Sequence, residues 1–261
     1  MIYQFCARTD PGRARENNED AVVFDAVTQT MVLADGMGGY NAGEIASGMA
    51  TAFIKSELSR WLAEAGSGAT IKEVRRAMEI CVANANLSVY NAATSNAQYA
   101  GMGTTLVVGV FLNQTLLLGH IGDSRCYRLR GGVLEQITKD HSLLQEQIDA
   151  GLITPAQAVN SSIKNLVTRA LGVEAQVVLE INEHVVQPGD MFMVCSDGLS
   201  DMVNDEVIAK IMMIEADLEP IADELVTTAN SNGGRDNISV LLAIASEVAE
   251  KRGLIARLLG K

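Results

Sequence analysis

Several aspartates in this chain lie at the ends of apolar runs. If these runs are buried strands, their end residues can lie close to one another in space. Asp35 and Asp197 each close such a run and are followed by glycine, in MVLADG and MFMVCSDG. Asp236 immediately precedes the last apolar run, NISVLLAIA. Asp-Gly is also a common turn pair, and for any one site alone the turn is the better explanation. Three such sites in one chain instead favour carboxylates that converge in space.

Further carboxylates make a metal site the simplest interpretation. Asp123 lies in GHIGDSR, and Glu19 and Asp20 lie in RENNEDA. Carboxylates gathered in one place repel one another unless cations lie among them, and hard oxygen ligands select Mg²⁺ or Mn²⁺. The three histidines are scattered, and the four cysteines form no CxxC pair, so zinc is not favoured. The sequence predicts an oxygen-liganded, binuclear site.

An arginine and a glycine-rich stretch accompany these carboxylates. Arg15 lies just before Asp20, and an arginine beside a metal cluster suits bidentate recognition of a phosphate. The alternative for Arg15 is a surface ion pair with Glu16 or Glu19. The glycines of DGMGG lack the lysine and the spacing of nucleotide-binding loops. We expect them to let the chain turn closely around a metal, with Gly36 offering its backbone carbonyl.

The elements that must position these residues come in blocks of one kind. Apolar residues at steps of three and four predict a long helix after Ala42 and a second from Ile71 to about Ala93. Short β-rich runs from 104 to 138 predict one antiparallel meander, and residues 141–172 have an interrupted helical pattern. The later expected elements are strands at 176–186, 190–197 and 237–245 and helices around 204–215 and 219–230. Block order favours an α+β sandwich of antiparallel sheets over a doubly wound parallel fold.

Composition limits the class of protein. The 261 residues show no linker or repeat, which predicts one domain, and 48% apolar with 20% charged residues is globular composition. A net charge of -12 makes nucleic acid a poor partner. The start resembles no signal peptide, and no apolar run approaches the about 18 residues of a membrane span. We therefore expect a cytoplasmic protein with reduced cysteines.

The motifs of the chain resemble, in order, the series of the metal-dependent protein phosphatases of type 2C, the PPM family. The matching stretches are TDPGRARENNEDA, VLADGMGGYNAGEIAS, GMGTTL, GHIGDSRCYRLR, ITKDHS, TRALG, VCSDGLSD and GGRDNISVLL, which together cover roughly residues 3–245. They look most like the bacterial serine/threonine members. The resemblance implies a four-layer α-β-β-α sandwich, in which helices flank two antiparallel sheets and the metal site lies at one edge.

The resemblance also assigns metal ligands. Asp35 is expected to bridge two Mn²⁺ or Mg²⁺ ions, with the Gly36 carbonyl on one of them. Asp197 and Asp236 look like ligands of the other ion. Asp123 matches the position that, with the aspartate of SDG, holds a third and weaker ion in bacterial members.

Three further positions complete the implied site. Glu19 and Asp20 fall where the family holds metal-bound waters, and the sequence does not decide which matters more. Arg15 occupies the position of the phosphate-binding arginine. The implied reaction is a single in-line displacement, in which a metal-bridging water or hydroxide attacks phosphorus and the serine or threonine alkoxide leaves.

The chain departs from the family pattern at two places and extends beyond it at the end. Met37 stands where animal members have a histidine proposed as the general acid, so the leaving group must take its proton from another source. Residues 162–165 lack the His-Pro of bacterial relatives, which affects the expected substrate preference. After a phosphatase domain at 1–246, residues 247–261 form a basic amphipathic tail that could dock on a partner, dock on a membrane or pack on its own domain.

The predicted function is that of a metal-dependent protein serine/threonine phosphatase. Its expected partners are phosphoprotein substrates and the bacterial Ser/Thr kinase that it opposes, and we expect a monomer. Two alternatives are a catalytically silent relative that binds phosphoproteins and a hydrolase of small phosphate esters. Silent relatives usually lose a metal carboxylate or the phosphate arginine, and this chain keeps Asp35, Asp197, Asp236 and Arg15.

Overall fold

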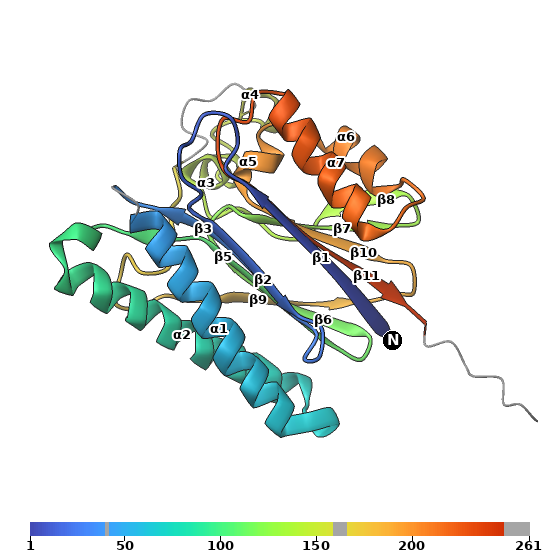
Figure 1. The fold of residues 1–261 in the computed structure, drawn as a ribbon, viewed down its shortest axis with the longest axis horizontal. Coiled ribbons are helices and arrows are strands. Elements are labelled where there is room, and N and C mark those ends of the chain that lie inside the picture. Colours follow the sequence, from blue (N-terminus) through green and yellow to red (C-terminus); the bar gives the residue numbers. More distant parts are fainter. Residues whose placement is uncertain (40–41, 159–165, 248–261) are drawn as a thin grey trace, which may run out of the picture.

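Two antiparallel sheets packed face to face form the centre of the molecule, and a pair of helices covers the outer face of each sheet (Figure 1). The computed structural model describes residues 1–39, 42–158 and 166–247. The four-layer α+β sandwich expected from the motif series is confirmed. None of the described helices is long and apolar enough to cross a bilayer.

The first sheet joins the two ends of the chain. Its order is β1 (Ile2–Asp10), β11 (Ile238–Ser246), β10 (Met191–Cys195), β7 (Arg125–Arg130) and β8 (Val133–Gln136). All neighbours are antiparallel, and β1 pairs with β11 from Ile2 opposite Ser246 to Asp10 opposite Ile238. The strand nearest the N-terminus is thereby held against the last strand of the domain.

The second sheet contains the other strands. Its order is β2 (Asp20–Asp25), β3 (Thr30–Met37), β5 (Leu106–Leu112), β6 (Thr115–Ile121) and β9 (Glu180–Val185), with the short β4 (Gly103–Thr104) paired to β3. These pairs are antiparallel as well.

Helices of two lengths cover the sheets. The long α1 (Ala42–Ala65) and α2 (Ile71–Ser95) pack on the second sheet, and α6 (Asp205–Met212) and α7 (Leu218–Ser231) pack on the first. The N-terminus of α2 is fixed by a capping box, in which Thr70 and Glu73 satisfy each other's backbone amides. The short α3 (Leu143–Asp149), α4 (Pro155–Ala158) and α5 (Asp197–Ser200) lie at one end of the sandwich (Figure 1).

Apolar side chains fill the space between the sheets and under each helix pair. Strand residues alternate between these cores, so that in β10 Val194 faces the opposite sheet while Met193 and Cys195 face the helices. Phe111 of β5 and Phe192 of β10 meet edge to face, with ring centroids 5.5 Å apart. The two sheets are thus held in register by direct packing.

The structure corrects part of the predicted order of elements. The two long helices are confirmed, but the runs from 104 to 138 do not form one meander. They form two hairpins in different sheets, because the chain crosses from β6 to β7 through Gly122–Ser124. Strands β1 and β2 had not been predicted. The interrupted helical pattern holds for α3 and α4 only, and the predictions for 162–165 and for the tail from 248 lie outside the described residues.

Candidate metal-binding active site

Aspartates from both sheets meet at one end of the sandwich. Asp20 opens β2 and lies directly opposite Asp35 near the end of β3. Asp197 opens α5 directly after β10, and Asp236 precedes β11. Asp123 lies in the loop that crosses between the sheets. The charges of the other four aspartates all act on the Asp35 carboxyl, so the predicted residues are brought together.

The backbone around Asp35 is fixed by hydrogen bonds to neighbouring segments. The Asp35 amide donates to Thr105 Oγ1 over 3.0 Å, and the Thr105 amide donates to the Asp35 carbonyl over 2.9 Å. The Gly36 amide donates to the Glu19 carbonyl over 3.1 Å. A Cβ on Gly36 would lie 2.1 Å from the Gly43 carbonyl oxygen, so only glycine lets the start of α1 approach β3 this closely.

Asp20 carries an orphaned acceptor. Its Oδ2 accepts a hydrogen bond from Ser196 Oγ at 2.7 Å, and Ser196 in turn accepts from the Ser239 amide at 3.0 Å. Its Oδ1 is buried and has no hydrogen-bond partner among the described residues. Burial raises the pKa of Asp20 to about 7. An unpartnered buried oxygen of this kind indicates that a bound group outside the chain completes the site.

Burial and mutual repulsion raise the pKa values of the other carboxylates as well. The pKa of Asp197 rises to about 8 through burial and through the charges of Asp123 and Asp236. The pKa of Asp123 rises to about 6, with burial first and Asp140 second. The pKa of Asp35 is raised well above its ordinary value by burial and by Asp20. Without a cation this cluster resists ionisation, and a divalent ion among the oxygens would remove that resistance.

Glu19 occupies a different position from Asp20. Its carboxylate lies against the start of α1, where burial raises its pKa and Arg15 and the Gly43 amide oppose that rise. Its backbone carbonyl accepts from Gly36 and from Ser47 Oγ, the latter at 2.6 Å. Glu19 therefore supports the loop around Gly36, whereas Asp20 presents its carboxylate beside Asp35.

Arg15 reaches the cluster from the loop between β1 and β2. Its Nη2 donates to Asp236 Oδ2 at 2.8 Å, and half of the Arg15 side chain is exposed. The ion pair considered from the sequence was with Glu16 or Glu19, whereas Arg15 pairs with a residue distant in the chain. A guanidinium has five N–H groups, so the pair with Asp236 leaves donors for a phosphoryl group.

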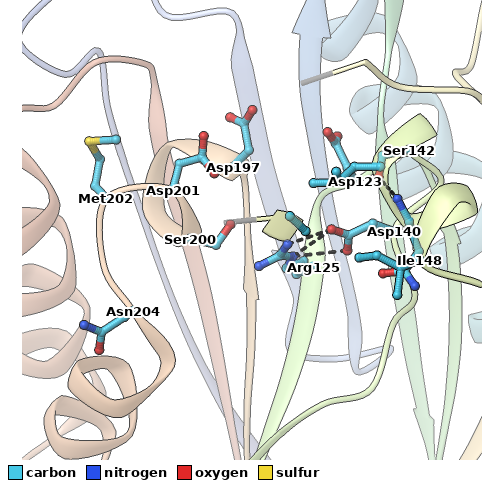
Figure 2. A pocket seen from close by; sticks show the side chains of 13 residues that line it. Asp123, Arg125, Asp140, Ser142, Ile148, Asp197, Ser200, Asp201, Met202 and Asn204 are labelled. Carbon is cyan, nitrogen blue, oxygen red and sulfur yellow. Dashed lines mark hydrogen bonds and ion pairs between the residues drawn. The ribbon is translucent and has the colours of Figure 1, made fainter. Parts of the chain in front are cut away.

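A cavity of about 480 Å³ opens beside the cluster. Figure 2 shows Asp197 and Asp201 on one side of this cavity and Asp123 with Asp140 on the other. Arg125 donates to both oxygens of Asp140, with Nη2 2.7 Å from Oδ2, so its charge is neutralised within the wall of the cavity. Sequence reasoning did not single out Arg125 or Asp140, although both belong to the motifs GDSR and TKDHS.

Cys195 lies two residues before Asp197, but its thiol takes no part in this site. It is fully buried among the side chains beneath α6 and α7, and burial raises its thiol pKa to about 12. A thiol of this pKa carries almost no thiolate at neutral pH, and the thiolate is the nucleophile. The site is therefore one of carboxylates and an arginine.

Comparison with known proteins gives the same picture. The family model of Protein phosphatase 2C matches residues 12–243. The serine/threonine phosphatase stp of Listeria innocua is 38% identical over 240 residues, which cover 90% of this chain and 93% of that protein. The serine/threonine protein phosphatase PstP of Mycobacterium tuberculosis is 38% identical over 244 residues, covering 93% of this chain and 45% of that protein.

Solved structures agree with the sequence relatives. The crystal structure of M. tuberculosis PstP/Ppp matches with a TM-score of 0.85 and 35% identity, over 95% of this chain and all of that one. The PstP catalytic domain in complex with two manganese ions matches with a TM-score of 0.82 and 36% identity, over 94% of this chain and 99% of that one. This chain belongs to the protein phosphatase 2C family.

Proposed function

We propose that this chain is a metal-dependent protein phosphatase that hydrolyses phosphoserine and phosphothreonine in proteins. The observation that carries the proposal is the meeting of five aspartates and one arginine at the edge of a 2C-family sandwich. Of the relatives of similar length, one is named a serine/threonine phosphatase and another a protein phosphatase. Their names support a protein substrate over a small phosphate ester.

The donor set fits Mn²⁺ or Mg²⁺. The converging side chains offer oxygen only, and Asp20 Oδ1 is a buried acceptor with no partner among the described residues. In our proposal Asp35 would hold both of two ions, the Gly36 carbonyl would bind one of them, and Asp197 and Asp236 would bind the other. Asp123 contributes to a third, weaker site.

Ions held there supply Lewis acidity toward water and toward the phosphoryl oxygens. The side chains themselves provide placement and charge. Asp20, whose free oxygen lies beside Asp35, orients water, and Glu19 supports the Gly36 loop that carries the ligands. The exposed face of Arg15 donates to phosphoryl oxygens and stabilises their charge as the ester bond breaks. Met37 has no proton to donate, so the alkoxide takes its proton from elsewhere.

We further propose the cellular setting of this activity. Residues 1–246 form the phosphatase domain, and 247–261 are a separate tail. The substrates are phosphoproteins made by a bacterial Ser/Thr kinase, and the enzyme acts as a monomer in the cytoplasm. All four cysteines are free and buried, which is compatible with a reducing compartment.

Phosphate release from a phosphothreonine peptide tests the proposal. We expect release with Mn²⁺, none with EDTA, and a loss of at least a hundredfold in Asp197→Ala. Asp217→Ala, which removes a carboxylate at the start of α7, the end of that helix opposite to the one that leads to Asp236, is the matched control and should keep full activity. Mn²⁺ binding without any release would instead support a silent, phosphoprotein-binding relative, and faster turnover of nucleotides than of peptides would support a small-ester hydrolase.

A further inference from the structure

His141 connects three segments next to the proposed metal site, and the function proposed above gives it no part. Its backbone amide donates to the Gly122 carbonyl over 2.9 Å, and the Gly122 amide donates to His141 Nδ1 over 3.2 Å. Its carbonyl accepts from the Thr168 amide at 2.8 Å. Its Nε2 lies 3.2 Å from Glu180 Oε2 in β9. One buried residue thus joins the loop between the sheets, the chain after residue 165, and an edge strand.

These contacts select one tautomer of His141. Because Nδ1 accepts from the Gly122 amide, the proton of the neutral ring lies on Nε2 and is donated to Glu180. Burial lowers the pKa of His141, with Glu180 opposing and His120 and Arg169 adding to that effect. The neutral form is the one that can accept at Nδ1.

A separate cation site formed by His120, His141 and Glu180 is the competing explanation, since their ligand atoms lie within 4.8 Å of one another. The two imidazoles are stacked, with centroids 4.6 Å apart and planes 16° apart. Nitrogen lone pairs lie in the ring planes, so nearly parallel rings do not aim them at one ion. His120 Nε2 already donates to the Lys139 carbonyl at 2.8 Å, and the Arg169 guanidinium lies 3.4 Å from His141 Nε2. The cluster is a hydrogen-bond network.

The peptide groups that His141 holds are those that lead into Asp123. Gly122 has a φ of +100°, and a Cβ there would lie 2.7 Å from Thr105 Cγ2, so the loop has a conformation reserved for glycine. On the other side of Asp123, the hydroxyls of Ser124 and Thr105 form a 2.7 Å hydrogen bond. The Thr105 hydroxyl also accepts a hydrogen bond from the Asp35 amide. Asp123 is therefore held from both sides, by Thr105 through Ser124 and by His141 through Gly122.

We propose that His141 is a positioning residue for Asp123, which acts through the hydrogen bond from the Gly122 amide to Nδ1. Glu180 selects the tautomer that makes this bond. The inference rests on the proposed metal-dependent function, in which Asp123 is a ligand of the most weakly bound ion. Loss of the Nδ1 acceptor should loosen Asp123 and weaken that ion, while the ion bridged by Asp35 is retained.

Two amide substitutions test the two ring nitrogens of His141 separately. In His141→Asn the amide oxygen stands at the position of Nδ1 and can accept from Gly122, whereas the contact with Glu180 is lost. In His141→Gln the amide reaches the position of Nε2 and can donate to Glu180, whereas Nδ1 is lost. Mn²⁺ alone is titrated into each metal-free protein by calorimetry, with Asp123→Asn as the reference for a missing ligand. Mn²⁺ dependence of phosphate release is measured in parallel.

We expect His141→Gln to weaken the weakest Mn²⁺-binding step about tenfold, the effect of one lost hydrogen bond, and His141→Asn to stay within about threefold of wild type. His141→Gln should add less than twofold to Asp123→Asn, since both act at one site. Unchanged binding in His141→Gln, or equal weakening in both amide variants, would overturn the proposal. If His141→Gln melts below the assay temperature, a tenfold loss in His141→Asn alone overturns it. Absence of Mn²⁺ binding in the wild type would instead contradict the proposed function.

Discussion

The substitution Asp197→Asn should stabilise the metal-free protein and destabilise the Mn²⁺-loaded protein. It keeps the shape of the side chain and removes its charge. In the folded, metal-free chain the pKa of Asp197 is raised from 3.8 to about 8 by burial and by Asp123 and Asp236. Between these two values the unfolded chain binds fewer protons than the folded chain, so stability falls as pH rises from about 4 to 8. An amide in place of the carboxyl would remove this dependence.

The size of the effect follows from the same difference. Each pKa unit corresponds to about 1.4 kcal/mol, so the raised pKa of Asp197 costs the folded, metal-free chain about 5 kcal/mol of stability at pH 8 and about 2 kcal/mol at pH 5. Asp197 is partly exposed, and water lowers this cost, so we expect about half of it. For a domain of this size, about 2–3 kcal/mol corresponds to a melting temperature higher by about 5–10 °C at pH 8, with a smaller rise at pH 5.

Thermal unfolding in EDTA and in Mn²⁺, each at pH 5, 6.5 and 8, is the assay. In Mn²⁺ the sign should reverse, because the variant loses a ligand and the stabilisation that bound metal provides. Asp217→Asn is the control and should shift neither series by more than about 1 °C. A lower melting temperature for Asp197→Asn in EDTA at pH 8, or a shift independent of pH, would refute the electrostatic account of the cluster.

Four further outcomes test the site and its frame. EDTA should lower the melting temperature of the wild type and abolish phosphate release, and an unchanged melting curve would argue against a preformed metal site. Asp35→Asn should lower kcat by at least a hundredfold with an unaltered circular dichroism spectrum, and near-normal turnover would exclude a bridging role. Arg15→Ala should raise KM about tenfold or more for a phosphopeptide, while Mn²⁺ binding measured by calorimetry stays near wild type. Gly198→Ala should cost about 3 kcal/mol in denaturant unfolding, because its Cβ would lie 1.9 Å from the Asn237 carbonyl oxygen.

The strand-end aspartates could be predicted from sequence because an apolar run, an acid and a glycine mark where a buried strand stops. Whether these aspartates come together depends on which strands are neighbours, and the hydrophobic pattern of the sequence does not contain that information. The crossing from β6 to β7 shows the limit, since a Gly-Asp-Ser loop can reverse a hairpin or carry the chain to another sheet. Only the packing of β7 beside β10 decides between them.

Glu19 and Asp20 show a second limit. Neighbouring residues at the start of a strand point to opposite sides, and a one-residue change of register would exchange their roles. The register that places Asp20 opposite Asp35 comes from the pairing of β2 with β3. Arg15 meets Asp236 only because β1 and β11, the first and last strands of the domain, are neighbours.

The sandwich packing has a consequence for residues far from the chemistry. Asp20 and Asp35 belong to one sheet, whereas Asp197 and Asp236 lie next to the ends of strands in the other. The distances between these carboxylates therefore depend on how the two sheets are aligned. A functional constellation tolerates a misplacement of only about 0.5 Å. Backbone hydrogen bonds within each sheet would survive a slide of that size, because they do not cross the interface. Edge-to-face contacts such as that of Phe111 with Phe192 therefore fix the position of one sheet relative to the other. Substitutions there can abolish activity while both sheets remain folded.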